Sequence, residues 1–201
     1  MKGIVLAGGL GTRLSPLTKV ASKQLLPVYD KPLIYYPLST LMLASIKEIL
    51  IIAVPNQIER FKDLLGSGSE FGLKIEYKIQ EKPTGIAESL ILSEEFLKGS
   101  KSALILGDNL FHGSGLGRRL ETFIDTGGAQ IFGYHVQDPS PYGVATINDN
   151  GLVTALNEKP KNSLSKIAIP GLYFFDESAS NRARNLKPSP RGELEILDLL
   201  K

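Results

Sequence analysis

Short apolar runs alternate with helical patterns along most of this chain, and that alternation limits the possible folds more than any other feature. The apolar runs are rich in Ile, Val and Leu and end at turn residues, which is typical of strands. We expect strands over Gly3–Ala7, Glu48–Val54, Lys74–Gln80, Ala103–Leu106 and Ala129–His135. We expect helices over Leu33–Ser45, Gln57–Leu65, Ile86–Leu97 and Leu116–Asp125. This order predicts an α/β fold, with a mostly parallel sheet and helices on both of its faces.

The pattern changes from Tyr142 onward. Apolar residues flank the turn sequence Asn148–Gly151 on both sides, which favours a β-hairpin. The segment Ile167–Phe175 predicts another strand, and Glu177–Leu186 predicts a helix. We therefore expect a strand-rich lobe that covers the crevice of the sheet.

Loops after three of the expected parallel strands carry residues with chemical functions. In open α/β sheets, ligands bind beyond the carboxyl ends of the strands. The sequence places a glycine loop at residues 8–13, the segment 80–85 after another strand, and residues 107–109 after a third. We expect these three segments to converge at one edge of the sheet.

The glycine loop reads Gly-Gly-Leu-Gly-Thr-Arg, ends at Arg13, and is followed ten residues later by Lys23. Its spacing fits neither the P-loop nor the dinucleotide-binding fingerprint, which has a third glycine where this chain has Leu14. Glycines nevertheless let backbone N–H groups approach a phosphate closely. The two cations can offset charge on a triphosphate, so this segment favours phosphate binding over a simple tight turn.

Two further polar residues end expected strands. Asp108 is either a turn aspartate or a magnesium ligand, because magnesium prefers hard carboxylate oxygens shared with phosphates. Gln80 carries both a donor and an acceptor, so its amide can read the edge of a pyrimidine base. His112 and His135 have no neighbouring His or Cys, and we interpret neither as a metal ligand.

Composition excludes several classes of function. The net charge of +2 is too small for a nucleic-acid-binding surface, and the absence of cysteine excludes disulfides and thiolate metal sites. No apolar stretch reaches membrane-spanning length. The first residues lack a basic region followed by an apolar run, so we expect no secretory leader and a cytoplasmic protein.

Longer blocks occur in a fixed order along the chain. They are LAGGLGTRL (Leu6–Leu14), SKQLLPVYDKPLIYYPLSTLMLASI (Ser22–Ile46), QEKPTGIA (Gln80–Ala87), LGDN (Leu106–Asn109), NEKPK (Asn157–Lys161), GLYFFD (Gly171–Asp176) and RGELEI (Arg191–Ile196). Together they resemble the sugar nucleotidylyltransferases and, within them, the glucose-1-phosphate thymidylyltransferases. The resemblance implies a Rossmann-like three-layer α/β sheet, mostly parallel, with a strand-rich sugar-binding lobe. It implies a single domain over residues 1–201, with a nucleotide-binding half (1–140) and a sugar-phosphate-binding half (141–201).

The same resemblance implies an activity. It is nucleotidylyl transfer from dTTP to glucose 1-phosphate, which gives dTDP-glucose, a deoxysugar precursor, and pyrophosphate. The cofactor implied is Mg²⁺, held by Asp108. The residues implied to be catalytic are Arg13, Lys23, Lys159 and Arg191.

Binding roles follow from the resemblance as well. Gln80 is implied to pair with the base edge, with the Gly85 backbone beside it, and Glu158 to accept hydrogen bonds from sugar hydroxyls. The implied nucleotide-binding set is Leu6, Gly8, Gly9, Gly11, Thr12, Arg13, Gln80, Pro83 and Gly85. The implied sugar-phosphate-binding set is Asn109, Tyr142, Gly143, Glu158, Lys159, Tyr173 and Arg191.

The sequence also departs from the family's pattern. Asn157 stands where many members have an acidic residue, a change that we expect to be mild. The family continues beyond the equivalent of Lys201 with a second magnesium-binding aspartate in a Trp-x-Asp-Thr-Gly-like motif, and this chain has no Trp. We therefore expect the chain to fold and bind nucleotide but to turn over poorly. We also expect exposed apolar surface at Leu194, Ile196, Leu197, Leu199 and Leu200.

Two alternatives remain open at this point. One is a module that binds a nucleotide or nucleotide sugar without turnover. The other is a related transferase that uses UTP or another sugar 1-phosphate. The resemblance implies small-molecule partners, neither nucleic acid nor membrane, and a homo-oligomer in the full-length family.

Overall fold

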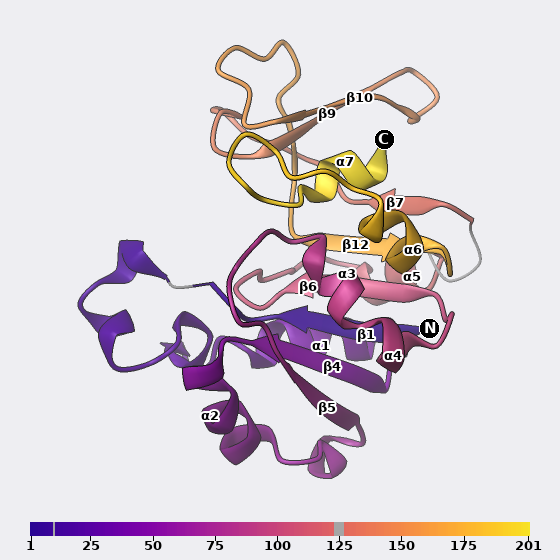
Figure 1. The fold of residues 1–201 in the computed structure, drawn as a ribbon. Coiled ribbons are helices and arrows are strands. Elements are labelled where there is room, and N and C mark those ends of the chain that lie inside the picture. The colour runs from indigo at the N-terminus through magenta and orange to yellow at the C-terminus, as the bar shows by residue number, and fades with distance from the viewer. Residues whose placement is uncertain (10, 123–126) are drawn as a thin grey trace.

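The computed structural model describes residues 1–9, 11–122 and 127–201, and a six-stranded sheet lies at its centre (Figure 1). The strands, in spatial order, are β5 (Lys74–Ile79), β4 (Glu48–Ala53), β1 (Lys2–Leu6), β6 (Ser102–Leu106), β12 (Leu172–Phe175) and β7 (Ala129–Ile131). The first four are mutually parallel, whereas β12 runs antiparallel to both of its neighbours. The mostly parallel sheet expected from the sequence is confirmed.

Side chains on alternate positions of these strands enter two separate apolar clusters. On β1, Val5 belongs to the cluster on one face and Ile4 to the cluster on the other, and both are fully buried. On β4, Ile49 and Ile51 likewise face one cluster, while Leu50 and Ile52 face the other. Burial on both faces explains why these strands are continuous apolar runs rather than alternating ones.

Helices cover both faces of the central sheet. Those that contribute to the first cluster are α1 (Tyr35–Leu43), α2 (Pro55–Leu65) and α5 (Leu116–Glu121). Those that contribute to the second cluster are α3 (Glu88–Leu92), α4 (Glu94–Leu97), α6 (Ala179–Arg184) and α7 (Ile196–Leu200). Within the described residues, no helix has both the length and the apolar character needed to cross a bilayer.

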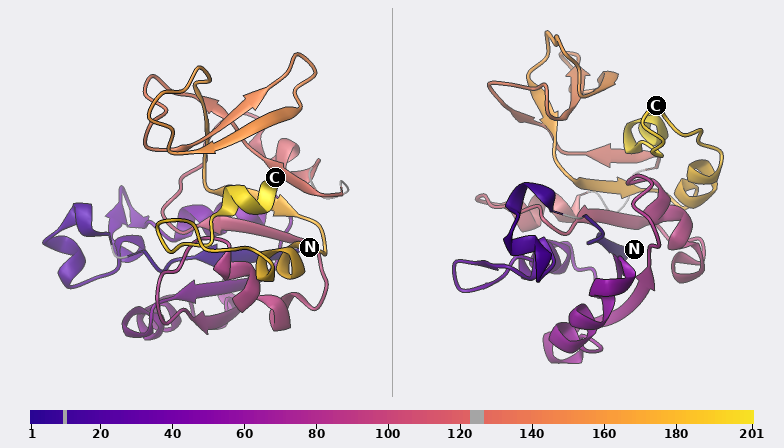
Figure 2. Two further views of the ribbon diagram at one scale, coloured as in Figure 1. Left: turned by 45° about the horizontal axis from the view of Figure 1, so that its top comes forward. Right: turned by 60° about the vertical axis from the view of Figure 1, so that its left-hand side comes forward.

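A second, antiparallel sheet forms the strand-rich lobe, which stands above the central sheet in both views of Figure 2. Its spatial order is β10 (Val153–Glu158), β9 (Gly143–Ile147), β11 (Ile167–Ile169) and β8 (Tyr134–His135). The hairpin expected around Asn148–Gly151 is confirmed by the pairing of β9 with β10. The Asn148 Oδ1 atom accepts hydrogen bonds from the backbone N–H groups of Asn150 and Leu152, both at 3.0 Å, and so stabilises the turn.

Short elements fill the segment between β1 and α1, which projects from the sheet at the left of Figure 1. They are the 3-10 turns η1 (Thr12–Leu14), η2 (Leu17–Lys19) and η3 (Lys23–Leu25) and the paired strands β2 (Pro27–Val28) and β3 (Lys31–Pro32). A further 3-10 turn, η4 (Ser69–Phe71), precedes β5. The sequence analysis predicted none of these elements.

Two expected strands are each divided between the two sheets. The segment Ala129–His135 forms β7 in the central sheet and β8 in the lobe, so the prediction of one strand was wrong. The segment Ile167–Phe175 is interrupted at Pro170 and Gly171, because proline has no N–H to donate to a sheet. A Cβ atom on Gly171 would lie 2.4 Å from Cγ of Leu106, so the chain crosses closely over β6 at that point.

Two expected helices differ from the prediction. The segment Ile86–Leu97 forms two helices, α3 and α4, joined at Ser93. There the Ser93 hydroxyl donates a 2.5 Å hydrogen bond to the backbone oxygen of Ser89, a contact that bends helices. The helix α5 ends at Glu121, and Thr122 follows it in a turn. Residues 123–125 of the predicted span lie outside the described residues.

The exposed apolar surface predicted near the end of the chain was wrong. Ile196, Leu197 and Leu199 are buried in the second cluster, and Leu194 and Leu200 pack against it. The helix α7 turns its apolar side toward the sheet and contacts β10 of the lobe. It therefore forms part of the core that joins the two sheets.

A pH-dependent test of this fold uses Tyr77 on β5. Burial raises the pKa of Tyr77 to about 12, and its hydroxyl donates to the backbone oxygen of Gly66 at 2.6 Å. The unfolded phenol titrates near pH ~10, so the folded chain holds this proton more tightly. The stability that this group contributes is complete below about pH 10 and is lost as the pH rises toward about 12.

We expect Tyr77→Phe to weaken this alkaline loss of stability. Urea midpoints at about pH 8 and about pH 11 measure it, and the difference between the two should be smaller in the variant than in the parent. Tyr29→Phe, at an almost fully exposed position, is the matched control. An equal pH dependence in parent and Tyr77→Phe would contradict the assignment.

Candidate active site

The loops after β1, β5 and β6 meet at one edge of the central sheet, as the sequence predicted. They line a first cavity of about 230 Å³. Its lining residues are Leu6, Gly8, Gly9, Gln24, Gln80, Pro83, Gly85, Ile86, Leu106, Asp108 and Glu193. A second cavity, of about 320 Å³, lies between this edge and the lobe and shares Ile86, Leu106 and Glu193 with the first. The two cavities therefore adjoin each other, and together we call them the groove.

Gln80 lies at the inner wall of the first cavity and is 2% exposed. Its Nε2 atom donates a 2.5 Å hydrogen bond to a carboxylate oxygen of Glu88, the first residue of α3. Its Oε1 atom lies beside Gly8, where an added Cβ atom would be only 2.6 Å away. The absence of a side chain at position 8 therefore leaves the space that the amide occupies.

Asp108 follows β6 and contacts two neighbours. Its Oδ2 atom accepts from the Lys23 ammonium at 2.9 Å, and its Oδ1 atom accepts from Asn109 Nδ2 at 2.9 Å. Asn109 Oδ1 in turn accepts from the backbone N–H of Gly171 at 3.0 Å, which ties this turn to the start of β12. Both the Asp108 and the Lys23 side chains remain about one-third exposed, so incoming ligands can reach them.

A hard divalent cation fits this position in part. Magnesium usually takes one or two carboxylates, keeps several waters and shares phosphate oxygens, and Asp108 offers one carboxylate beside the cavity. The described part of the chain contains no group of three or more His, Cys, Asp or Glu side chains arranged to hold a metal. The chain's described residues therefore offer one ligand at this position, and phosphate oxygens must complete the set.

Arg13 is exposed, lines the second cavity, and makes no hydrogen bond or ion pair with the described residues. Gly11, just before it, has a left-handed backbone with φ of 59° and packs closely against Thr18 and Lys23. The Thr18 hydroxyl donates to the Gly11 oxygen at 3.0 Å and holds the turn. Leu10, within the predicted glycine loop, lies outside the described residues.

Opposite charges are paired in the second cavity. Arg191 donates from Nε and Nη2 to the buried carboxylate of Glu195, at 2.8–3.1 Å, and from Nη2 to Glu158 at 3.3 Å. The hydrogen bond with Glu195 is the main cause that raises the pKa of Arg191. Lys159 lies 3.6 Å from the Glu158 carboxylate, and its backbone N–H donates to Tyr142 O at 3.0 Å. This end of the groove presents two cations held by carboxylates.

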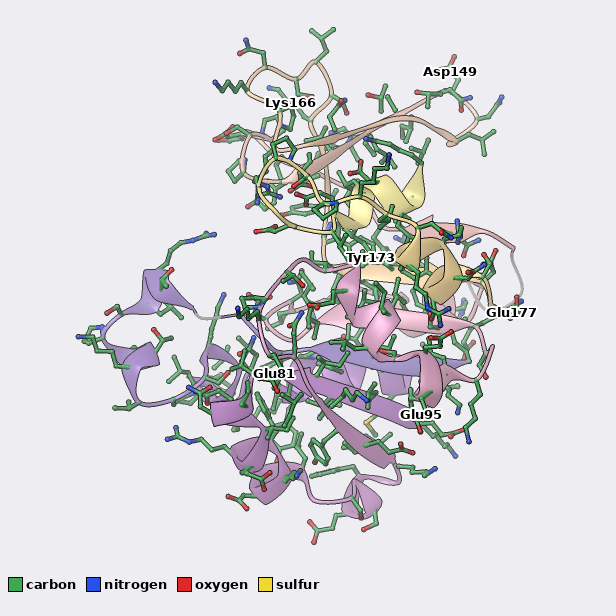
Figure 3. All side chains as sticks on the ribbon, in the orientation of Figure 1. Glu81, Glu95, Asp149, Lys166, Tyr173 and Glu177 are labelled. Atoms are coloured by element: carbon green, nitrogen blue, oxygen red, sulfur yellow. The ribbon has the colours of Figure 1, made fainter. Side chains whose placement is uncertain are left out.

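Tyr173 of β12 is 4% exposed and lies between the central sheet and the lobe (Figure 3). Burial, and secondarily the negative charge of Glu158, raise the pKa of its hydroxyl well above the ordinary value. The phenol is therefore neutral at physiological pH. It can serve as a neutral wall of the second cavity.

The segment 191–196 is joined to the segment 83–87 through backbone contacts. Leu194 N–H donates to Thr84 O at 2.8 Å, and Ala87 N–H donates to Leu194 O at 3.2 Å. Gly85 has a φ of 120° and packs against the backbone of Leu194 between these two hydrogen bonds. A Cβ atom on Gly85 would be 2.4 Å from Leu194 O. Only glycine fits this position, because the backbone conformation and the available space both exclude a side chain.

The structure brings most of the predicted site residues into the groove. Those lining the first cavity are Leu6, Gly8, Gly9, Gln80, Pro83, Gly85 and Asp108. Those lining the second are Arg13, Asn109, Tyr142, Gly143, Glu158, Lys159, Tyr173 and Arg191. Lys23 joins them through its ion pair with Asp108, whereas Gly11 and Thr12 line neither cavity.

Several polar residues at or beside the groove were not predicted from the sequence. Gln24, Glu193 and Glu195 line it, whereas Glu88 lines neither cavity and contacts Gln80. Gln24 and Glu195 are buried polar side chains, at 3% and 8% exposure. The only sequence signal for Glu193 and Glu195 was their place beside Arg191, where cations usually have acidic partners. Glu88 carried no signal, because its contact with Gln80 depends on how α3 packs against β5.

A larger cavity, of about 520 Å³, adjoins the groove at Asn109, Tyr134 and Pro170. It is lined mainly by residues 110–116 and 132–134, and His112 is among them. Of the predicted site residues, only Asn109 reaches it.

This sheet is mostly parallel and carries a glycine loop, a carboxylate and several cations near its carboxyl edge. Such an arrangement is typical of enzymes that bind nucleotides. The family model described as nucleotidyl transferase matches residues 2–201. The chain belongs to the nucleotidyl transferase family, which confirms the resemblance found in the sequence.

Curated relatives of this chain carry a more specific name than the family model does. The glucose-1-phosphate thymidylyltransferase of Xanthomonas campestris pv. campestris (strain B100) is 54% identical over 199 residues, covering 98% of this chain and 68% of that protein. The enzyme of the same name from Neisseria meningitidis is 51% identical over 200 residues, covering 99% of this chain and 69% of that protein. The chain thus spans about two-thirds of the length of these relatives.

Solved structures give the same result for the fold. One from Bacillus anthracis, assigned as a glucose-1-phosphate thymidylyltransferase in complex with sucrose, has a TM-score of 0.90 and 41% identity. It is matched over 99% of this chain and 80% of that one. A UDP-glucose pyrophosphorylase complexed with UDP-glucose has a TM-score of 0.84 over 99% and 84% of the two chains, at 24% identity, so that likeness concerns the fold alone.

The contact between the two segments leads to a test. Gly85→Ala should displace the segment 191–196, because the new Cβ atom meets backbone atoms of Leu194 in a conformation that alanine rarely adopts. We expect a loss of about 2–4 kcal/mol in stability. Urea unfolding measures the loss. Gly113→Ala, whose Cβ would meet nothing within 4 Å, is the control, and equal stability of the two variants would refute the argument.

Proposed function

We propose that this chain transfers the nucleotidyl group of dTTP to α-D-glucose 1-phosphate, producing dTDP-glucose and pyrophosphate. The observation that carries the proposal is the groove formed by the two adjoining cavities. It joins a buried amide and a glycine loop at one end to paired cations and a carboxylate at the other. The names of the curated relatives and of the Bacillus anthracis structure support the choice of substrates.

In this proposal the first cavity holds the nucleotide. The Gln80 amide meets the edge of the base, and the Gly85 backbone lies beside it. Gly9 leaves room for the nucleotide to approach the strand end, and Gly8 leaves room for the Gln80 amide. Arg13 lines the adjoining second cavity and has no partner among the described residues, so it is free to contact the triphosphate where it extends there. The Lys23 side chain packs against Gly11.

The second cavity holds the sugar phosphate. Glu158 accepts hydrogen bonds from the sugar hydroxyls, and Tyr142, Gly143 and Tyr173 form the wall. Lys159 and Arg191 contact the phosphate. Their ion pairs with the phosphate then replace part of their ion pairs with Glu158.

The chemistry needs little covalent participation from the protein. A phosphate oxygen of glucose 1-phosphate is already anionic, so it attacks the α-phosphorus without a strong general base. Asp108 would hold Mg²⁺, which would supply positive charge to offset that of the phosphates. Arg13 and Lys23 stabilise the departing pyrophosphate, while Lys159 and Arg191 orient the attacking group.

A second candidate is a transferase that uses UTP. Uracil has the same N3–H and carbonyl edge as thymine. In this proposal the Gln80 amide contacts only that edge of the base, so it accepts both bases. Steady-state kcat/KM values with dTTP and with UTP separate the two.

Pyrophosphate release in the presence of dTTP, glucose 1-phosphate and Mg²⁺ tests the proposal directly. Calorimetry with dTTP and Mg²⁺ runs beside it, because binding without turnover would identify the chain as a binding module. If the chain shows neither binding nor turnover, the proposed function is refuted.

Arg13→Ala should lower kcat by about a hundredfold or more and leave dTTP affinity within a few fold, because the guanidinium meets charge that develops during transfer. Lys19→Ala, which removes an exposed cation on the neighbouring turn η2, is the control and should behave like the parent. Equal kcat values for Arg13→Ala and the parent would remove Arg13 from the mechanism.

Asp108→Asn should raise the Mg²⁺ concentration needed for half-maximal dTTP binding by about tenfold or more, because the variant loses the carboxylate charge. Calorimetric titrations at a series of Mg²⁺ concentrations measure this shift. Asp149→Asn, in the exposed hairpin turn of the lobe, is the matched control. An unchanged Mg²⁺ requirement would exclude Asp108 as the ligand.

A further inference from the structure

We propose that Glu88 fixes the orientation of the Gln80 amide, and that this orientation makes the site select pyrimidine bases carrying an N3–H group. Glu88 acts here as a positioning residue that touches Gln80 and not the base. The inference rests on the proposed function, because it assigns the specificity of that same nucleotide site.

The hydrogen bond between the two side chains has only one possible polarity. An ionised carboxylate accepts hydrogen bonds and cannot donate them, whereas an amide has a donating NH₂ and an accepting oxygen. The Gln80 atom that faces Glu88 must therefore be Nε2, as the structure has it. The other end of the amide, Oε1, then lies beside Gly8, and both residues line the first cavity.

The rest of the Gln80 residue is held as well. Its backbone N–H donates to Ala53 O at 2.9 Å, at the end of β4, and the side chain is almost fully buried. The described residues include none that donates a hydrogen bond to Oε1. Oε1 is thus an acceptor without a protein donor, and a ligand that leaves such a buried acceptor unpaired binds more weakly.

This acceptor matches the middle of one type of base edge. Thymine and uracil place an N3–H donor between two carbonyl oxygens, whereas cytosine places an unprotonated nitrogen at N3. With Oε1 fixed toward the cavity, thymine N3–H satisfies it, and cytosine N3 opposes it with a second lone pair. Sites that hydrogen-bond a substrate group discriminate strongly against ligands that lack it.

Without a fixed neighbour, the same amide could rotate by half a turn. Nε2 would then face the cavity and could donate to cytosine N3. Glutamine at position 88 has both a donor and an acceptor at nearly the same size, so it permits either orientation of Gln80. Glu88→Gln is therefore a substitution that removes the orientation and little else.

The experiment compares calorimetric dissociation constants of dTTP and dCTP, with Mg²⁺, for the parent, Glu88→Gln, Gln80→Ala and the double variant. We expect Glu88→Gln to reduce the preference for dTTP over dCTP by about tenfold or more, with tighter dCTP binding contributing to the change. In the Gln80→Ala background the same substitution should have no further effect on the preference, because Glu88 acts through Gln80.

Controls separate orientation from general damage. Glu95→Gln, on the neighbouring helix α4 and outside the groove, should keep the preference of the parent. The 3-methyl derivative of dTTP, which lacks N3–H, should bind the parent as weakly as dCTP. If Glu88→Gln does not fold, as judged by thermal unfolding, Glu88→Ala replaces it, since it also leaves the amide free to rotate.

The outcomes distinguish this inference from the proposed function. A parent that binds neither nucleotide, or both equally, overturns the proposed thymidylyl specificity together with the role of Glu88. A parent that prefers dTTP while folded Glu88→Gln keeps the full preference overturns only the role of Glu88. A change of preference that persists in the Gln80→Ala background also overturns it, because Glu88 would then act on the base by another route.

Discussion

The contact between the backbones of residues 84–87 and Leu194 is the constraint on which the groove depends. Two hydrogen bonds at this point, of 2.8 and 3.2 Å, join the loop after β5 to the segment that carries Arg191. That segment continues into α7, whose apolar residues are buried against the central sheet and which contacts the lobe. The two ends of the groove are thus held at a fixed distance by packing and backbone pairing rather than by a flexible linker.

The charges of the groove are already partly compensated before a ligand arrives. Lys23 pairs with Asp108, and Arg191 pairs with a carboxylate that is itself 8% exposed. Such pairing holds long side chains in one conformation, so less conformational entropy is lost when a phosphate binds. Arg13 is the exception among these cations, because it lies exposed on a short 3-10 turn without a described partner.

Local pattern and family resemblance predicted the parallel strands and the meeting of the three loops, because burial on both faces leaves a strong apolar signal. The division at residues 132–133 was missed, since a switch between sheets depends on contacts with neighbouring strands and not on local propensity. The division at residues 170–171 did have a local signal, the Pro170–Gly171 pair, which was overlooked. The burial of Leu197 was missed because α7 is only a few residues long, and its position is set by tertiary packing. Glu88 was missed for a similar reason, as its partner Gln80 lies on another element.

The wall shared by the two cavities has a thermodynamic consequence. Ile86, Leu106 and Glu193 line both cavities, so any ligand that restrains them at one end also restrains them at the other. If the first ligand orders these side chains, the second loses less conformational freedom of the protein on binding, and the two cavities are positively coupled. By thermodynamic reciprocity, a ligand of one cavity then strengthens binding in the other by the same factor in either order. Titrations in both orders of addition measure this factor, and a value of one would show that the two ends of the groove act independently.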